Sequence, residues 1–233
     1  MEIRGFEVQD EAVIAFVATV VVVGGGLVLL SGGSTESGFS LPEGANRTSM
    51  QFSTVLQGHQ RALSATDHYE TVTINGENAS RTFYLWSDLT SRVALYNSTI
   101  NDRKIFLNYT EDMAYRNDGS SFELTERARS SFNPSLITLP VQVIPSGINA
   151  LDQIEFSYEG TEMVDGVRAA RYSVSGMQDP AAPLNVTDGF VIVDSESRIR
   201  RMELDTGLGS ISYRLEMKEL DLERPSWAGN RTQ

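Results

Sequence analysis

The chain offers few side chains for catalysis or metal binding. It contains no cysteine, and His59 and His68 are its only histidines. A zinc site would need carboxylates to complete it, and no His-x-x-x-His spacing is present. The motifs of serine hydrolases, phosphate-binding loops, dinucleotide-binding folds and zinc proteases are also missing from the sequence. We therefore predict a protein that is not an enzyme, with no catalytic residue, no metal site and no cofactor.

Other groups with binding chemistry have plainer explanations. The acidic pair Glu111–Asp112 belongs to a chain with 31 acidic residues, where a solvated surface is expected. The Arg200–Arg201 pair has the chemistry to hold a phosphate or a glycan carboxylate, although a charge pair at a strand end is commoner. We expect His59 to be a hydrogen-bonded, half-buried histidine rather than a ligand.

The charge of the chain restricts its partners. The net charge is −12, and two lysines stand against seventeen arginines. This balance argues against nucleic acid and anionic headgroups as partners. An acidic, lysine-poor surface suits solubility in high salt, where charge screening is short-ranged. We predict a halophilic protein, with an acidic secreted domain from a GC-rich genome as the alternative.

Asparagine sequons indicate the compartment. The motif Asn-x-Ser/Thr is present six times, whereas chance predicts about two for this composition. Together the six support an extracytoplasmic, glycosylated surface. The predicted glycosylation sites are Asn46, Asn78, Asn97, Asn108, Asn185 and Asn230.

An apolar run near the N-terminus predicts a membrane anchor. Residues 12–30 contain one weakly polar member, Thr19, and as a helix they would span about 28 Å, close to the thickness of a bilayer core. The preceding residues 1–11 are acidic rather than basic, which favours a retained helix over a cleaved signal peptide. The positive-inside rule places residues 1–11 in the cytoplasm and the rest of the chain outside.

The residues after this run favour a tether without a lipid. Leu30 to Ser34 resemble a lipoprotein cleavage box, but Gly33 stands where the lipidated cysteine would be. We expect the helix to replace the lipid as the attachment. Residues 31–47 predict a flexible stalk, residues 48–227 one folded domain, and residues 228–233 a short tail.

The folded domain begins with a predicted helix over residues 48–65. Its apolar residues are spaced as one helical face, and Thr48 or Ser49 could cap the start. The positions on that face are Phe52, Val55, Leu56, His59 and Leu63.

After this helix the apolar period changes to two, as in half-buried antiparallel strands. Hairpin signals lie between the alternating runs at Asn75-Gly76, Asp118-Gly119 and Asp165-Gly166, and the polar residues 194–197 join two more. The spacing predicts a meander of about nine to eleven strands. Three prolines punctuate the apolar residues 126–152, which predict short helical turns against the open face of the sheet.

Two hairpins carry a family resemblance. Tyr158 to Val174 resembles the paired central strands of the lipoprotein-carrier superfamily, which includes LolA-type carriers and LppX-type lipoproteins. The run from Phe190 to Asp194 followed by Ile199 to Leu204 is similar to its next hairpin, and Pro225-Ser226-Trp227 resembles the end of haloarchaeal surface lipoproteins. The resemblance implies an unclosed β-barrel wrapped over helices, whose apolar cavity holds acyl chains in the better-known relatives.

These observations predict an α+β fold, with an N-terminal transmembrane helix followed by a half β-barrel. The leading functional hypothesis is a membrane-anchored protein that binds or carries a lipid-like ligand in the concave half-barrel. The alternative is a structural or interaction module of the cell envelope, with a packed core and a protein partner. The residues predicted to line the cavity are Phe83, Leu85, Val93, Leu95, Ile105, Leu107, Leu139, Ile144, Phe156, Tyr172, Val174, Ile192, Leu204 and Tyr213.

Overall fold

The computed structural model describes residues 39–76, 79–124, 135–136, 153–177, 185–207 and 209–229. The predicted anchor and most of residues 126–152 lie outside these ranges. Within them, no helix is long and apolar enough to cross a membrane. The sequence-based prediction of a single membrane span therefore remains a prediction.

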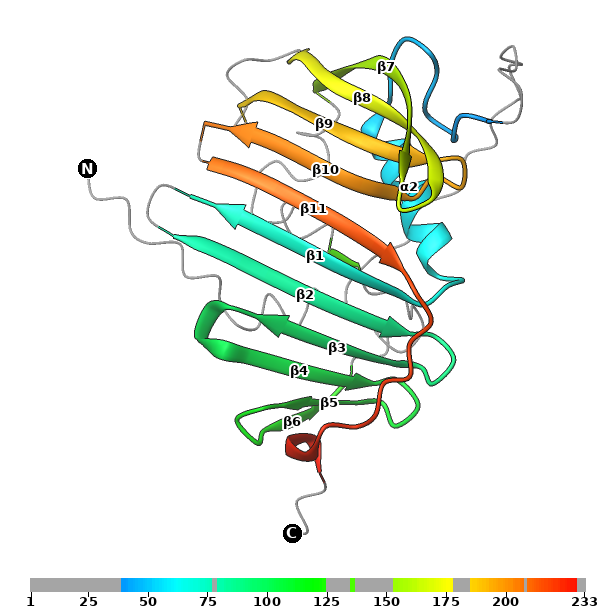
Figure 1. The fold of residues 1–233 in the computed structure, drawn as a ribbon. Helices are drawn as coiled ribbons and strands as arrows, with labels where there is room; N and C mark the ends of the chain where they lie inside the picture. Colours follow the sequence, from blue (N-terminus) through cyan, green and yellow to red (C-terminus); the bar gives the residue numbers. More distant parts are fainter. Residues whose placement is uncertain are drawn as a thin grey trace, which may run out of the picture.

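One large antiparallel sheet dominates the fold (Figure 1). Its eleven strands lie in the order β6-β5-β4-β3-β2-β1-β11-β10-β9-β8-β7, so two meanders join where β1 pairs with β11. The edges are β6 and β7, which do not pair, and the sheet is therefore unclosed. The first meander contains β1 (His68–Asn75), β2 (Ser80–Asp88), β3 (Val93–Ser98), β4 (Arg103–Asn108), β5 (Met113–Arg116) and β6 (Ser121–Glu123).

The second meander contains β7 (Ile154–Val164), β8 (Val167–Met177), β9 (Val186–Asp194), β10 (Ile199–Thr206) and β11 (Gly209–Met217). Two short 3-10 helices, η1 (Ile100–Asp102) and η3 (Ser226–Ala228), complete the elements outside the sheet together with the helix α2. The predicted half-barrel of nine to eleven strands is confirmed in its sheet. The prediction of several helices under the sheet is not confirmed, because α2 is the only α-helix among the described residues.

The predicted turns lie where the strands reverse. Asp165 and Gly166 connect β7 to β8 with φ angles of 50° and 79°, the left-handed backbone that a two-residue hairpin requires. Asp118-Gly119 lies between β5 and β6, and residues 194–197 connect β9 to β10. The turn residues in the sequence therefore correctly predicted where these strands reverse.

The helix α2 (Phe52–Leu63) buries the predicted apolar face, but its predicted cap is wrong. The residue before the helix is Gln51, which makes no capping hydrogen bond through its side chain. Thr48 and Ser49 instead belong to a turn in which their backbone N–H groups donate to Oδ1 of Asn46, at 2.8 and 2.9 Å. Thr48 and Ser49 therefore lie in this turn, before the helix begins, and do not cap it.

Gly189 is required by the close pairing of β9 with β10. Its φ is 141°, and a Cβ atom there would lie 2.2 Å from the backbone oxygen of Glu203. Gly160 has a similar φ of 130°, but its Cβ would meet nothing within 4 Å. We expect Gly189→Ala to reduce the free energy of unfolding by about 2 kcal/mol more than Gly160→Ala does, since both variants share the cost of the backbone angle. Urea denaturation of the two variants measures this difference, and equal losses would contradict the steric argument.

Candidate functional site

The concave face of the sheet, which we define as the side that carries α2, has an apolar wall. Strand register brings Leu85 and Leu215 opposite Glu70 on β1, and Phe83 and Tyr213 opposite Val72. These apolar side chains belong to one buried cluster that extends along the sheet from Ala114 on β5 to Phe156 on β7. Alternation along each strand therefore builds a continuous apolar surface on this face.

The helix α2 packs on the half of the concave face formed by β7 to β11 (Figure 1). The ring of Phe52 stacks on Phe156 of β7, with 5.8 Å between the centroids. Gly58 lets the helix approach the turn before β10, because a Cβ atom there would lie 2.6 Å from Cβ of Ser197. The helix thus fills one half of the face, and no described helix lies over β2 to β6.

His59 is the polar centre of the contact between α2 and the sheet. The backbone N–H of Ile199 donates to its Nδ1 at 3.0 Å, so the ring proton resides on Nε2, which lies 3.1 Å from the hydroxyl of Tyr213. Burial is the main cause that lowers the pKa of His59 to about 3. The expectation of a half-buried histidine was wrong in degree: the ring is fully buried, because strands β10 and β11 enclose both nitrogens. It is hydrogen-bonded, as expected.

Glu70 is a carboxylate on the same buried face. Its Oε2 accepts hydrogen bonds from the backbone N–H of Leu136 and from the hydroxyl of Ser135, the latter at 3.2 Å. Nε2 of His68 lies 3.6 Å from Oε1 of Glu70, and both side chains are fully buried. Burial, and secondarily the charge of Glu70, raises the pKa of Tyr213 well above its usual value. Glu70 therefore fastens residues 135–136, which lie between β6 and β7 in sequence, to the centre of the sheet.

This cluster connects segments that are distant in the chain. His59, Glu70 and Tyr213 are all buried, and their polar atoms link α2, β1, β10, β11 and residues 135–136. Among the described residues, no group of three or more histidine, aspartate or glutamate side chains is placed to hold a metal ion. Sequence reasoning missed Glu70, although the alternation His68, Glu70, Val72 placed it on an inward position.

The structure divides the predicted cavity residues between two faces. Eight lie buried in the concave cluster and Val174 packs against it, whereas Leu139 and Ile144 lie outside the described residues. The concave eight are Phe83, Leu85, Ile105, Leu107, Phe156, Tyr172, Leu204 and Tyr213.

Three of the predicted cavity residues pack in separate clusters. Val93 and Leu95 pack with Phe106 and residues of the C-terminal segment, and Ile192 packs with Ala169. The reason on β3 is that Ala94 and Tyr96 occupy the inward positions, so a strand that is apolar on both faces hid its orientation. Ligand binding by any of these residues stays a prediction.

Four predicted glycosylation sites lie in the described ranges, and Asn78 and Asn230 lie outside them. Asn46 and Asn185 are exposed, whereas Asn97 on β3 and Asn108 at the end of β4 are partly buried. Oδ1 of Asn108 accepts the backbone N–H groups of Thr110 and Glu111, both at 3.0 Å. Two of the four sequons therefore also stabilise turns, at Asn46 and Asn108.

No protein-family model matches the sequence, and no curated protein matches it. Solved structures similar to it include LprF from Mycobacterium bovis, with 15% identity over 75% of this chain and 96% of that chain, at a TM-score of 0.41. LppX from Mycobacterium tuberculosis has 16% identity over 72% of this chain and 96% of that chain, at a TM-score of 0.39. The MucA/MucB complex from Pseudomonas aeruginosa has 12% identity over 72% of this chain and 58% of that chain, at a TM-score of 0.38. LppX, the lipoprotein type that the hairpins resemble, is thus among the similar structures. None of these similarities assigns a ligand to this chain.

Proposed function

We propose that this protein binds a hydrophobic, lipid-like ligand on the concave face of its sheet. The observation that carries the proposal is one apolar surface that extends beyond the helix packed on it. The apolar cluster continues across the unclosed sheet, but α2 packs only on its β7–β11 half. An acyl chain is a suitable partner for the other half, because binding sites for small ligands are concave and mostly apolar.

The polar cluster supports this proposal by fixing one boundary of the site. Glu70 holds the backbone of Leu136 and the hydroxyl of Ser135 near the middle of the sheet, beside the contact of His59 with Tyr213. A ligand on the β2–β6 half would therefore lie against a wall that is polar on the β1 side and apolar elsewhere. This arrangement favours a ligand with one long apolar part.

A second candidate is a structural or interaction module with a packed core. Its support is the burial of the concave side chains: Leu85 and Ile105 are each 1% exposed. A core this well covered needs no ligand for its stability. The two candidates differ in whether an acyl chain binds on the β2–β6 half of the concave face.

We also propose the location that the sequence predicts. Residues 12–30 anchor the chain in the membrane of a halophilic archaeon, and the sheet domain lies on the extracytoplasmic face, where its sequons are glycosylated. The support is the apolar run and the number of sequons in the sequence. Protease protection in intact cells and mass spectrometry of the glycopeptides test the two parts separately.

Two phenylalanines provide a matched pair for the concave site. Phe122 of β6 packs against the concave cluster on the β2–β6 half, whereas Phe190 of β9 packs in a separate cluster. Each ring is partly buried and lies beside a guanidinium, that of Arg116 or Arg171. We expect Phe122→Ser to weaken binding of a long-chain fluorescent fatty acid by about fivefold to tenfold, because a hydroxyl replaces an apolar contact. Phe190→Ser should bind as the unmodified chain does. Equal affinities for all three proteins, or no binding at all, would contradict the proposal.

A further inference from the structure

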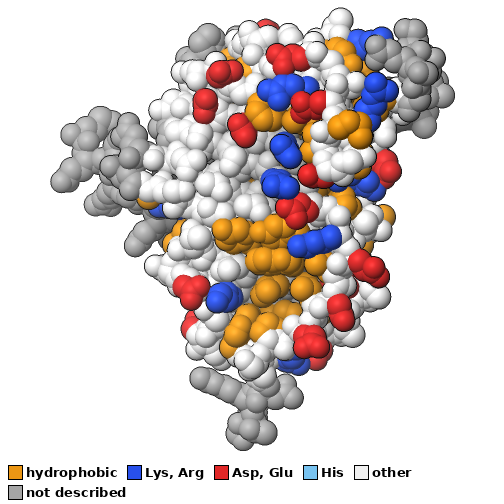
Figure 2. All heavy atoms as spheres, viewed as in Figure 1, with side chains coloured by type: hydrophobic (Ala, Val, Ile, Leu, Met, Phe, Trp, Pro, Cys, Tyr) orange, Lys and Arg blue, Asp and Glu red, His pale blue; other side chains and the backbone are white. Residues whose placement is uncertain are grey.

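The convex face, opposite α2 and toward the viewer in Figures 1 and 2, carries an apolar row across five strands. Register pairs Tyr69 of β1 with Trp86 of β2, then Trp86 with Leu95, Leu95 with Phe106, and Phe106 with Tyr115. A continuous apolar row on the outer face of a sheet is unusual, since this face is ordinarily solvated and polar. Figure 2 shows apolar side chains gathered on this face beside basic and acidic side chains.

The C-terminal segment covers one end of this row. Leu222, Trp227 and Ala228 pack with Leu95, Phe106 and Tyr115 in a cluster separate from the main core. The segment is fixed by its backbone, because the N–H of Leu222 donates to Oδ2 of Asp88 at 3.2 Å. The β3–β5 end of the row is therefore an internal contact of the protein.

The β1–β2 end of the row is partly exposed and forms an aromatic cluster. Tyr69, Tyr84 and Trp86 lie with ring centroids 4.9 to 6.4 Å apart and with ring planes within 34° of one another. None of the three belongs to a buried cluster of the described residues. Aromatic rings that remain accessible on a folded surface are typical of binding sites.

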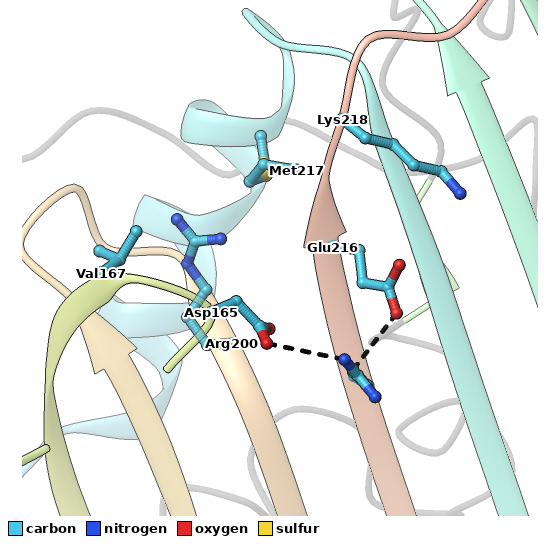
Figure 3. A pocket seen from close by; sticks show the side chains of 7 residues that line it. Asp165, Val167, Arg200, Glu216, Met217 and Lys218 are labelled. Carbon is cyan, nitrogen blue, oxygen red and sulfur yellow. Dashed lines mark ion pairs between the residues drawn. The ribbon is translucent and has the colours of Figure 1, made fainter. Parts of the chain in front are cut away.

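Figure 3 shows a charged pocket that includes the end of β11, the strand paired with β1. It has a volume of about 370 Å³ and lies between the β7–β8 turn and the end of β11. The guanidinium of Arg214 lies 3.6 Å from Asp165 and 3.4 Å from Glu216, the ion pairs drawn as dashed lines. Glu216 is the residue that register places opposite Tyr69, so the pocket and the aromatic cluster share a boundary.

Lys218 connects the pocket with the aromatic cluster. It lines the pocket, and its Nζ lies 4.6 Å from the centroid of the Tyr69 ring. It forms no ion pair with any residue that the structure describes, although the chain as a whole has a net charge of −12. A cation that has no ion pair among the described residues is complementary to an anionic ligand.

We propose that this convex surface is a binding site for an acidic saccharide. The C–H face of a sugar ring packs on Tyr69, Tyr84 and Trp86, while its hydroxyls exchange hydrogen bonds with Glu216 and Arg214. A carboxylate or sulfate on the same or the next ring pairs with Lys218. A saccharide uses aromatic rings, carboxylate acceptors and a guanidinium donor together. An anionic membrane would not require carboxylates on the protein surface that binds it. The site lies on the face opposite the proposed lipid site and does not depend on it.

Tryptophan fluorescence tests the proposal in the full-length chain. Trp86 and Trp227 are the only tryptophans, so Trp227→Phe leaves emission from Trp86 alone. In this background we expect an oligomer of glucuronate at about 1 mM to change the emission, and a glucose oligomer of equal length to bind more weakly. Lys218→Gln should weaken binding of the acidic oligomer about threefold to tenfold and reduce its dependence on salt. Lys104→Gln, which changes the only other lysine, on β4, should leave it unaltered.

Three results would overturn the proposal. The first is no change in Trp86 emission with the acidic oligomer while the circular dichroism spectrum shows a folded protein. The second is equal weakening by Lys218→Gln and Lys104→Gln. The third is a response to vesicles of anionic phospholipid in the absence of any response to the saccharide, which would assign the surface to a membrane.

Discussion

Replacing Asp194 by alanine should lower the free energy of unfolding by about 3–5 kcal/mol, the range found when one partner of a buried ion pair is removed. Its Oδ2 accepts a hydrogen bond from Nε of Arg200 at 2.8 Å, and both side chains are almost fully buried. Without the carboxylate, the guanidinium of Arg200 would keep its charge in a buried site. The variant also loses the two hydrogen bonds that Oδ1 accepts from the backbone of Glu196 and Arg198.

A surface aspartate provides the control for this experiment. Asp165 pairs with Arg201 at 3.8 Å and with Arg214 at 3.6 Å, but its side chain is 38% exposed. We expect Asp165→Ala to cost less than about 1 kcal/mol, since exposed ion pairs contribute little. Urea denaturation measures both variants. A loss for Asp194→Ala no larger than that for Asp165→Ala would show that the buried pair does not hold the β9–β10 turn.

The second large effect is a loss of stability in mild acid caused by His59. Burial lowers its folded pKa to about 3, against an ordinary value of 6.5. Between these two values the unfolded chain binds a proton at His59 that the folded protein does not bind. The free energy of unfolding therefore falls as the pH drops from about 6.5, by up to about 1.4 kcal/mol per pH unit from this one group.

The variant His59→Gln isolates this contribution. Glutamine keeps one acceptor and one donor but does not titrate, so the pH dependence should become flatter between about pH 6.5 and 5, where carboxylates change little. Unfolding followed by circular dichroism at several pH values gives the slope for each protein. Parallel slopes for the variant and the unmodified chain would mean that His59 is accessible to protons in the folded state.

Those features of the fold that depend on neighbouring residues were predictable from the sequence. The Asp165-Gly166 hairpin follows from the backbone angles that an aspartate and a glycine adopt easily. The buried face of α2 follows from the spacing of Phe52, Val55 and Leu56. Alternation likewise placed Phe83 and Leu85 on the concave face.

Features that depend on distant partners were not predictable. The orientation of β3 is ambiguous in the sequence, because Val93 and Leu95 are as apolar as Ala94 and Tyr96. It is decided by the C-terminal segment, whose Trp227 and Ala228 cover the outer side of the strand. The partners of Glu70 lie 65 and 66 residues further along the chain, and no local pattern predicts their contact.

The two proposed sites divide the sheet by face. The concave face offers an apolar surface bounded by His59, Tyr213 and Glu70, whereas the convex face offers aromatic rings beside Arg214 and Lys218. The same strands β1 and β11 contribute to both faces through the alternation of their side chains. Variants on one face should therefore leave binding to the other unchanged.

Native mass spectrometry of the full-length chain, purified mildly from its own membranes, tests whether the concave face holds a lipid-like ligand. We expect a population heavier than the sequence mass and glycans by the mass of an acyl-containing molecule, which is released on unfolding and reduced in Phe122→Ser. A chain that carries no such molecule, and takes none up when mixed with lipid, would contradict the account. The concave face would then be the packed core of a structural or interaction module.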